Sequence, residues 1–357
     1  MALSISELSA YTLQELVPRS TDVIFKKSPL LVRLLNRSNV NFDGGMYIQR
    51  PIMYAELNGG FFSKTDTLNI AYVNTDTAFV VNPKYAYVSI YLYGTDDVLN
   101  AGRNAAFSQV ELKMANASAK MAKILATGIY QDGQTSSGTG VLSPTTSFDG
   151  LLAWIDDGNS YSSYSSSSNS DKSFAAIGGI TRTDLFTSAP TFSSAVTPVT
   201  GIGGANAYVN RAWSAFSLND IQVAFGNAWF GNDFPDLLVG TQTFFNKCWN
   251  ATQPSQRYMD SNSDVAKIGF KAFRFNGVSE IVVDKYLPSD GTNGVVFGLN
   301  TRYLELFVST NKKFQLGFTG FKDDQISINL AGQYLFSGNI LYANPRTGFK
   351  LVGTSIL

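Results

Sequence analysis

One long stretch of helical pattern, from Asp96 to about Tyr130, constrains the fold of this chain more than any other feature. Its apolar residues recur at alternating spacings of three and four, which is the pattern of a helix with one buried face. These residues are Phe107, Val110, Met114, Ala117, Met121 and Ile124. Asp97 suits the amino end of such a helix, and Gly128 suits its carboxyl end. We therefore predict a spine helix over residues 97–128, roughly 45 Å long and about three times the length of an average globular helix.

Composition limits the classes of protein to consider. The chain has 357 residues, of which 44% are hydrophobic, so it can bury a sizeable core. Its 27 basic and 27 acidic residues balance, and no bulk charge draws it to nucleic acid or to a membrane surface. No apolar run is long enough to span a bilayer, and no secretory signal pattern stands near the start. We expect a soluble protein without a membrane partner.

The chain contains no histidine, and this removes the usual proton shuttle and the commonest metal ligand. Its single cysteine, Cys248, has no histidine to activate it and no second cysteine for an internal disulfide, so we expect it in the core. Adjacent acids suit a glycosidase or a hard cation, but they are more typical of helix caps and solvated turns. These pairs are Asp96-Asp97, Asp156-Asp157 and Asp323-Asp324. We expect no enzymatic activity, no catalytic residue, no metal site and no cofactor.

Residues 1–45 hold too little apolar sequence for a domain, and they predict an arm. Ser28 followed by Pro29 is a good helix start, because the hydroxyl can cap the helix and proline fits its first turn. We predict a short docking helix over residues 29–36. Basic residues exceed acidic ones between positions 19 and 40, so the arm either faces nucleic acid or is solvated.

The period changes to that of extended chain after Gly45, and two strands flank a loop within residues 46–82. The loop carries Phe61 and Phe62, which a lone projecting loop cannot keep from water. These side chains need a partner. Residues 85–93 then alternate between aliphatic residues and tyrosine or serine, which predicts a strand that leads into the spine helix.

Residues 146–324 predict a second lobe of mixed α/β pattern. Ser217 and Thr241 each open a helical pattern with a capping side chain. Asn276-Gly277 stands between two β-rich runs and fits a two-residue type I′ turn. The β-rich carboxyl end, residues 325–357, returns to a sheet that earlier strands begin.

The order of these elements resembles the Hong Kong 97-type major capsid protein of tailed double-stranded DNA bacteriophages. The residues that carry the resemblance are Phe42-Asp-Gly-Gly, Tyr93-Gly-Thr-Asp-Asp-Val-Leu-Asn-Ala-Gly, Ile177-Gly-Gly-Ile-Thr-Arg, Phe275-Asn-Gly-Val and Leu341-Tyr-Ala-Asn-Pro-Arg. The resemblance covers nearly the whole chain and implies an α+β fold in four parts. These parts are an N-arm at 1–45, an extended loop at 46–82, a peripheral domain at 83–145 with 325–357, and an axial domain at 146–324.

The resemblance also implies a function. Such a chain self-assembles as pentamers and hexamers into an icosahedral shell around double-stranded DNA, in the cytoplasm of a bacterial host, and becomes the virion capsid. Portal, scaffolding and decoration proteins are the further partners that it implies. Phe61, Phe62 and Lys64 would contact a neighbouring subunit. Some members join a loop lysine to an asparagine, here Lys64 to Asn339 or Asn344, and we expect no such crosslink in this chain.

A set of basic side chains has two interpretations. The set is Arg33, Arg37, Arg103, Lys113, Lys120 and Lys123. One interpretation is a solvated polar face. The other is an inward face that offsets the repulsion between DNA phosphates without reading sequence.

Three other functions stay open at this point. An encapsulin-like compartment would have the same fold with a protein cargo. A β-rich phage adhesin that binds glycans would account for the tyrosines and the serine-rich run 161–170, but not for the spine helix. A glycosidase with paired carboxylates accounts for the fewest features.

Overall fold

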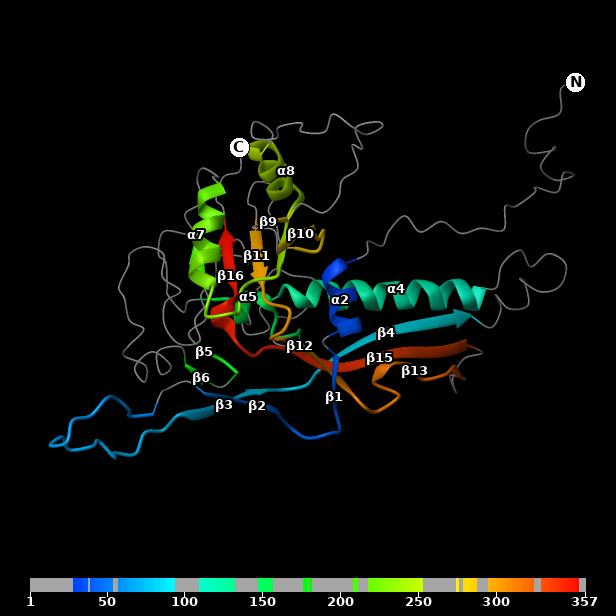
Figure 1. Ribbon diagram of the computed structural model, residues 1–357. Helices are drawn as coiled ribbons and strands as arrows, with labels where there is room; N and C mark the ends of the chain where they lie inside the picture. The colour runs from blue at the N-terminus through cyan, green and yellow to red at the C-terminus, as the bar shows by residue number, and fades with distance from the viewer. Residues whose placement is uncertain are drawn as a thin grey trace, which may run out of the picture.

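The computed structural model has an α+β fold built around two six-stranded sheets (Figure 1). It describes residues 28–37, 39–53, 57–93, 109–131, 147–156, 176–178, 180–181, 208–210, 218–252, 274–275, 279–287, 295–323 and 329–352. Among the described helices, none combines the length and the apolar composition that crossing a membrane requires.

The first sheet is organised by one long strand, β15 (Asn329–Tyr342). One edge of β15 pairs antiparallel with β4 (Lys84–Tyr93), in an unbroken register from Asn329 opposite Tyr93 to Gly338 opposite Lys84. The other edge pairs in turn with β14 (Lys322–Asp323), β13 (Gln315–Phe318) and β12 (Leu304–Ser309), and β12 also pairs in parallel with β1 (Asn39–Phe42). The predicted return of the carboxyl end to an earlier strand is thus what β15 does.

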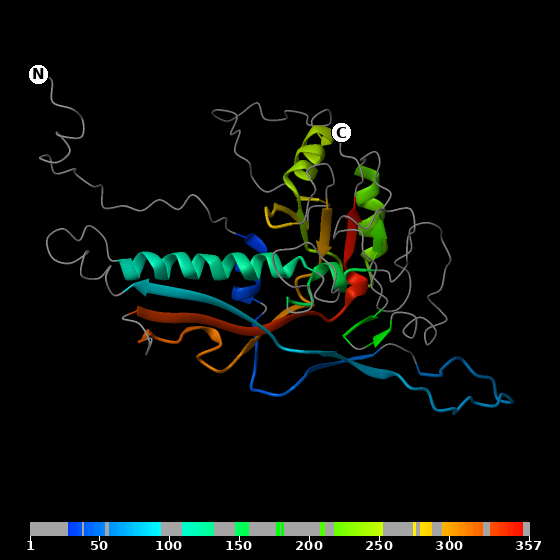
Figure 2. The ribbon, with the colours of Figure 1, turned by 180° about the vertical axis from the view of Figure 1, so that it is seen from behind.

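The long helix α4 (Gln109–Ile129) runs beside β4, as both views of the ribbon show (Figures 1 and 2). Its buried side chains are Ala117, Met121, Leu125, Ala126 and Ile129. Of the predicted stripe, Ala117 and Met121 are buried, Met114 and Ile124 are half-buried, and Val110 is exposed. The reason is that the core lies against the carboxyl half of the helix. The predicted helix start and Phe107 lie outside the described residues.

The second sheet has the order β7 (Tyr208–Asn210), β16 (Phe349–Val352), β11 (Val295–Leu299), β8 (Leu237–Gly240), β10 (Ser279–Val283) and β9 (Arg274–Phe275). Successive residues of a strand point to opposite faces, so each central strand serves two cores. Leu238 and Val296 pack with helices α7 (Leu218–Ala228) and α8 (Gln242–Thr252). Leu237 and Phe297 belong to the larger core that holds α5 (Leu151–Trp154) and the end of α4.

Local signals define the helix starts as expected. The Ser28 hydroxyl accepts the N–H of Leu31 at 3.4 Å and caps α2 (Pro29–Arg37). Thr241 likewise accepts the N–H of Phe244 at 3.4 Å. In the expected hairpin, Phe275 pairs with Ser279, so three residues connect the strands instead of two. The turn residues themselves lie outside the described part.

A two-stranded ribbon leaves this body. It consists of β2 (Ile48–Met53) and β3 (Asp76–Val81), paired antiparallel. Beside it lies a small hairpin of β5 (Ala176–Ile177) and β6 (Ile180–Thr181), and the N–H of Val80 donates to the carbonyl of Gly178 at 2.8 Å. Gly178 has a φ of +57°, and a Cβ atom there would lie 2.9 Å from the Phe79 ring. Only glycine fits this close approach without strain.

The sheets divide the chain differently from the expected domain boundaries. Strands β12 to β14, expected in the axial domain, pair into the sheet of β4 and β15. Strand β16, expected in the peripheral domain, lies in the second sheet. The short 3-10 helix η4 (Pro345–Thr347) lies between β15 of the first sheet and β16 of the second. Pairing between distant strands decides these boundaries, and no local pattern reveals it.

Candidate assembly interface

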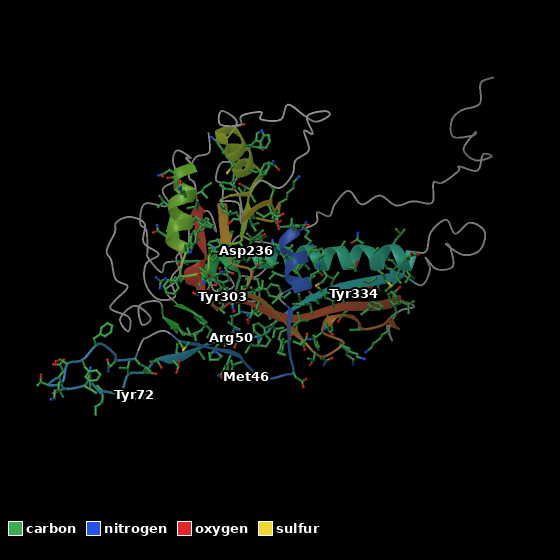
Figure 3. All side chains as sticks on the ribbon, in the orientation of Figure 1. Met46, Arg50, Tyr72, Asp236, Tyr303 and Tyr334 are labelled. Carbon is green, nitrogen blue, oxygen red and sulfur yellow. The ribbon has the colours of Figure 1, made fainter. Side chains whose placement is uncertain are left out.

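Residues 57–75, between β2 and β3, form a projecting loop whose apolar side chains face water (Figure 1). Phe61 is fully exposed, Ile70 is 92% exposed and Phe62 is 70% exposed. The exposed large apolar side chains of this loop are Leu57, Phe61, Phe62, Leu68, Ile70 and Tyr72, and Met53 at the end of β2 is exposed as well. Figure 3 shows Tyr72 on this loop, far from the core. A concentration of this size on one loop is typical of a protein interface.

The loop has internal order. Asp66 accepts the N–H of Ser63 at 2.6 Å, and its own N–H donates to the carbonyl of Ser63 at 3.0 Å, which closes a turn at the tip. The amide of Asn58 donates to the carbonyl of Ala71 at 3.0 Å and joins the two arms. Lys64 lies in the tip turn and is exposed. The loop therefore presents its apolar side chains from a shaped backbone.

The base of the ribbon is anchored firmly. Phe79 is fully buried and meets the Trp154 ring edge to face at 5.2 Å between centroids. Arg50, visible in Figure 3, pairs with Glu305 of β12 at 3.0 Å. Partial burial raises the pKa of Glu305, and Arg50 opposes that rise. The ribbon is fixed at one end and exposed at the other.

A second exposed surface lies on β4. Its even-numbered side chains turn to the core, and Ile90 and Leu92 are buried there. Its odd-numbered side chains turn to solvent and include Tyr85, Tyr87, Tyr91 and Tyr93. The two faces of β4 agree with the alternation predicted for residues 85–93.

A groove follows the free edge of β4 beneath α4. It has a volume of about 600 Å³ and is lined by Tyr87–Tyr91 of β4 and by Lys113, Asn116 and Lys120 of α4. A smaller hollow of about 160 Å³ shares Tyr87 and Ile124 with it. The lining of this hollow includes Lys84, the first residue of β4, and Gly128, near the carboxyl end of α4.

A third hollow, of about 580 Å³, contains acidic residues near β12. Each carboxylate already has partners: Asp236 accepts the N–H of Thr301 at 2.7 Å, and Asp233 accepts the Tyr303 hydroxyl at 2.5 Å. That hydrogen bond to Asp233 is the main cause of a raised pKa at Tyr303. Figure 3 shows Asp236 and Tyr303 between the two sheets. These acids hold the loop before β12 in place.

The described members of the predicted basic set have different partners. Arg33 forms an ion pair with Glu280 at 3.7 Å, and Lys113 donates to the carbonyl of Tyr91 at 3.0 Å. Lys120 lines the groove and is exposed, while Lys123 is half-buried. Arg103 and the side chain of Arg37 lie outside the described residues. The assignment of this set to packaged DNA stays a prediction.

Of the two asparagines considered for a crosslink, Asn339 is fully buried. Its amide donates to the carbonyl of Asn82 at 2.7 Å and to Asp149 at 2.8 Å, and its oxygen accepts the N–H of Asp149 at 3.0 Å. Asn339 therefore holds three chain segments together. Asn344 is half-buried beside η4.

Sequence reasoning identified the two phenylalanines of the loop but not the rest of its apolar set. Leu68, Ile70 and Tyr72 recur at every second position, and this period-2 spacing of large apolar residues was the available signal. The groove had no such signal, because its walls come from two elements whose contact only the fold creates.

The sequence matches no protein-family model and no curated protein. Solved structures are similar over the whole chain. The capsid protein of cyanophage A-1(L) is 13% identical with a TM-score of 0.64, over 99% of both chains. The capsid of a native GTA particle is 11% identical with a TM-score of 0.62, over 99% of this chain and 100% of that one. The SrpI encapsulin of Synechococcus elongatus is 9% identical with a TM-score of 0.55, over 98% of this chain and 95% of that one. The chain has the fold of phage capsid proteins.

Proposed function

We propose that the chain is a major capsid protein of the Hong Kong 97 type, which assembles as pentamers and hexamers into an icosahedral shell. The observation that carries this proposal is the projecting loop with its exposed Phe61, Phe62, Ile70 and Tyr72. The similarity to phage capsids over 99% of the chain supports it. A loop that docks on the next copy makes a head-to-tail contact, and such contacts generate a ring when the rotation between copies closes.

The free energy of burying apolar side chains favours assembly through this loop. Burial of one large apolar side chain stabilises by about 1.5–3 kcal/mol, and the contact repeats in every subunit. The base of the ribbon is anchored by Phe79 and by the ion pair between Arg50 and Glu305, so little further chain entropy is lost when the loop docks.

Negative-stain microscopy of the purified chain tests the proposal. The expected result is closed particles of uniform diameter. A chain that stays monomeric at high concentration, or that forms only irregular aggregates, would contradict shell assembly.

A protein compartment of the encapsulin type is the second candidate, because the chain is similar to an encapsulin over 98% of its length. The two candidates differ in what the shell encloses. We propose double-stranded DNA, bound without sequence specificity, with portal, scaffolding and decoration proteins as further partners of the virion capsid. An encapsulin-like shell would hold a protein cargo.

A further inference from the structure

Strand β4 lies at the edge of its sheet in the described part of the chain. In the described part of the chain it pairs with β15 alone, over ten residues and without a bulge. After Lys84 it carries no charge and no proline. Edge strands of soluble proteins are usually shortened, charged, bulged or covered, since a long apolar edge pairs with other chains. A partner strand would satisfy the backbone groups that β4 leaves unpaired within the described residues.

The side chain of Lys113 shows which backbone groups face this edge. Its Nζ donates to the carbonyl of Tyr91 at 3.0 Å. In an antiparallel ladder, backbone groups point alternately toward and away from the paired strand. The N–H and C=O groups of Tyr85, Tyr87, Ser89 and Tyr93 thus share the free edge with Tyr91, and no other hydrogen bond to this edge is found within the described residues.

The groove along this edge is positively charged. The groove and the adjoining hollow follow β4 from Lys84 to Tyr91, a length of roughly 26 Å at about 3.3 Å per residue. Lys84, Lys113 and Lys120 line them, but Lys84 forms an ion pair with Asp149 at 4.0 Å, so Lys113 and Lys120 supply the positive charge. Neither Lys113 nor Lys120 forms an ion pair with a described acid. An extended segment that is apolar and acidic would suit this groove.

The amino-terminal sequence has these properties. Residues 2–18 contain Glu7 and Glu15 but no lysine or arginine, and Leu3 and Ile5 alternate with serines. We propose that this segment adds as a strand to the β4 edge of its own chain, with Leu3 and Ile5 turned toward α4. Strand addition supplies main-chain hydrogen bonds for affinity, and the side-chain surroundings give specificity. The inference goes beyond shell assembly and does not depend on it.

Residues 19–27 are long enough to connect the start of α2 with a segment bound in the groove. Ser28 donates its hydroxyl hydrogen to Asp284, which also accepts the Tyr130 hydroxyl, so the start of α2 lies near the end of α4. Gly128, two residues before Tyr130, lines the near end of the hollow. Residues 19–27 can span roughly 30 Å when extended, at about 3.3 Å per residue. The tether also gives the chain's own segment a high effective concentration at the groove.

Disulfide mapping of the full-length chain in dilute solution tests the proposal. With Leu3 and Ile5 toward α4, Ser4 and Ser6 lie on the tyrosine face beside Ser89. We expect Ser6→Cys or Ser4→Cys to form an intramolecular disulfide with Ser89→Cys on mild oxidation. Cys248 is buried and does not compete. The matched control is Ser6→Cys with Ser118→Cys, because Ser118 is exposed and two residues from Lys120, on the opposite side of α4.

A charge swap supplies a second readout. Lys113→Glu with Lys120→Glu should lower the disulfide yield severalfold at low salt, and adding Glu7→Lys with Glu15→Lys should restore it. Three results would overturn the proposal: no disulfide with Ser89→Cys from either serine, equal yields with Ser118→Cys, or disulfides that join only different chains. The last result would assign the groove to a neighbouring subunit.

Discussion

Lys350 and Asp156 form an ion pair in which both side chains are fully buried, with Nζ and Oδ1 3.5 Å apart. Lys350 lies on β16, and Asp156 follows α5. Their sequence suggested no such role, because adjacent acids are usually capping or solvated. A buried ion pair contributes little net stability, but loss of one partner leaves a charge in a medium that solvates it poorly.

We expect Asp156→Asn to lower the free energy of unfolding by about 3–5 kcal/mol, because the Lys350 ammonium loses its carboxylate. The double variant Asp156→Leu with Lys350→Met should recover most of that loss. Urea unfolding at one protein concentration and one state of assembly gives the comparison. If Asp156→Asn were as stable as the parent, groups other than Asp156 would be shown to balance the charge of Lys350.

Cys248 is buried between α8 and the second sheet, and burial raises its pKa to about 12. Reactive thiolate is therefore scarce in the folded chain at pH 8–9, whereas an unfolded cysteine with a pKa of about 8.5 is reactive. We expect iodoacetamide to label Cys248 only after unfolding. Because the folded state holds the proton more tightly, stability should also fall as pH rises above about 8.5. Rapid labelling of native protein at pH 8 would contradict the buried position.

At the scale of elements, the extended ribbon divides into an anchored base and a free loop, and the two ends should respond differently to substitution. Phe61→Ser with Phe62→Ser should leave the fold intact, because both side chains are exposed in the single chain. Assembly should weaken by roughly 1.5–3 kcal/mol for each side chain that a neighbour would bury.

The measurements are circular dichroism for the fold and light scattering for assembly. Val223→Ser with Leu112→Ser is a matched control, because both residues are exposed and lie on helices away from the loop. A normal yield of intact shells from the phenylalanine double variant would remove the loop from the interface.

Local signals predicted the helices well, since caps and apolar spacing act over a few residues. Ser28 and Thr241 each cap a helix, and the helix expected after Ser217 begins at Leu218, although Ser217 itself lies outside the described residues. The spine stripe was less well predicted, because burial along α4 depends on where the core lies. Domain boundaries and the groove depend on the pairing of β4 with β15, which lie far apart in sequence. The exposure of the loop could be predicted because a projecting polar loop offers Phe61 and Phe62 no core of its own chain in which to be buried.

The contents of the assembled particle distinguish the capsid function from the compartment function. We expect particles from infected or lysogenic cells, treated with nuclease and then opened, to release protected double-stranded DNA. Their heat-induced DNA loss should be greatest at low ionic strength, where phosphate repulsion is least screened. Particles that release only a single protein species would assign the chain to the compartment class.

The pairing of β4 with β15 has a consequence for the order of events during synthesis. Nearly the whole chain must leave the ribosome before β15 can complete the sheet beside α4, because β15 ends at Tyr342. Contacts between such distant segments form slowly. The loop between β2 and β3 is synthesised early, whereas the two large sheets are completed only after β15 and then β16 have been synthesised. A nascent chain therefore exposes the loop between β2 and β3 before β15 has completed the sheet beside α4.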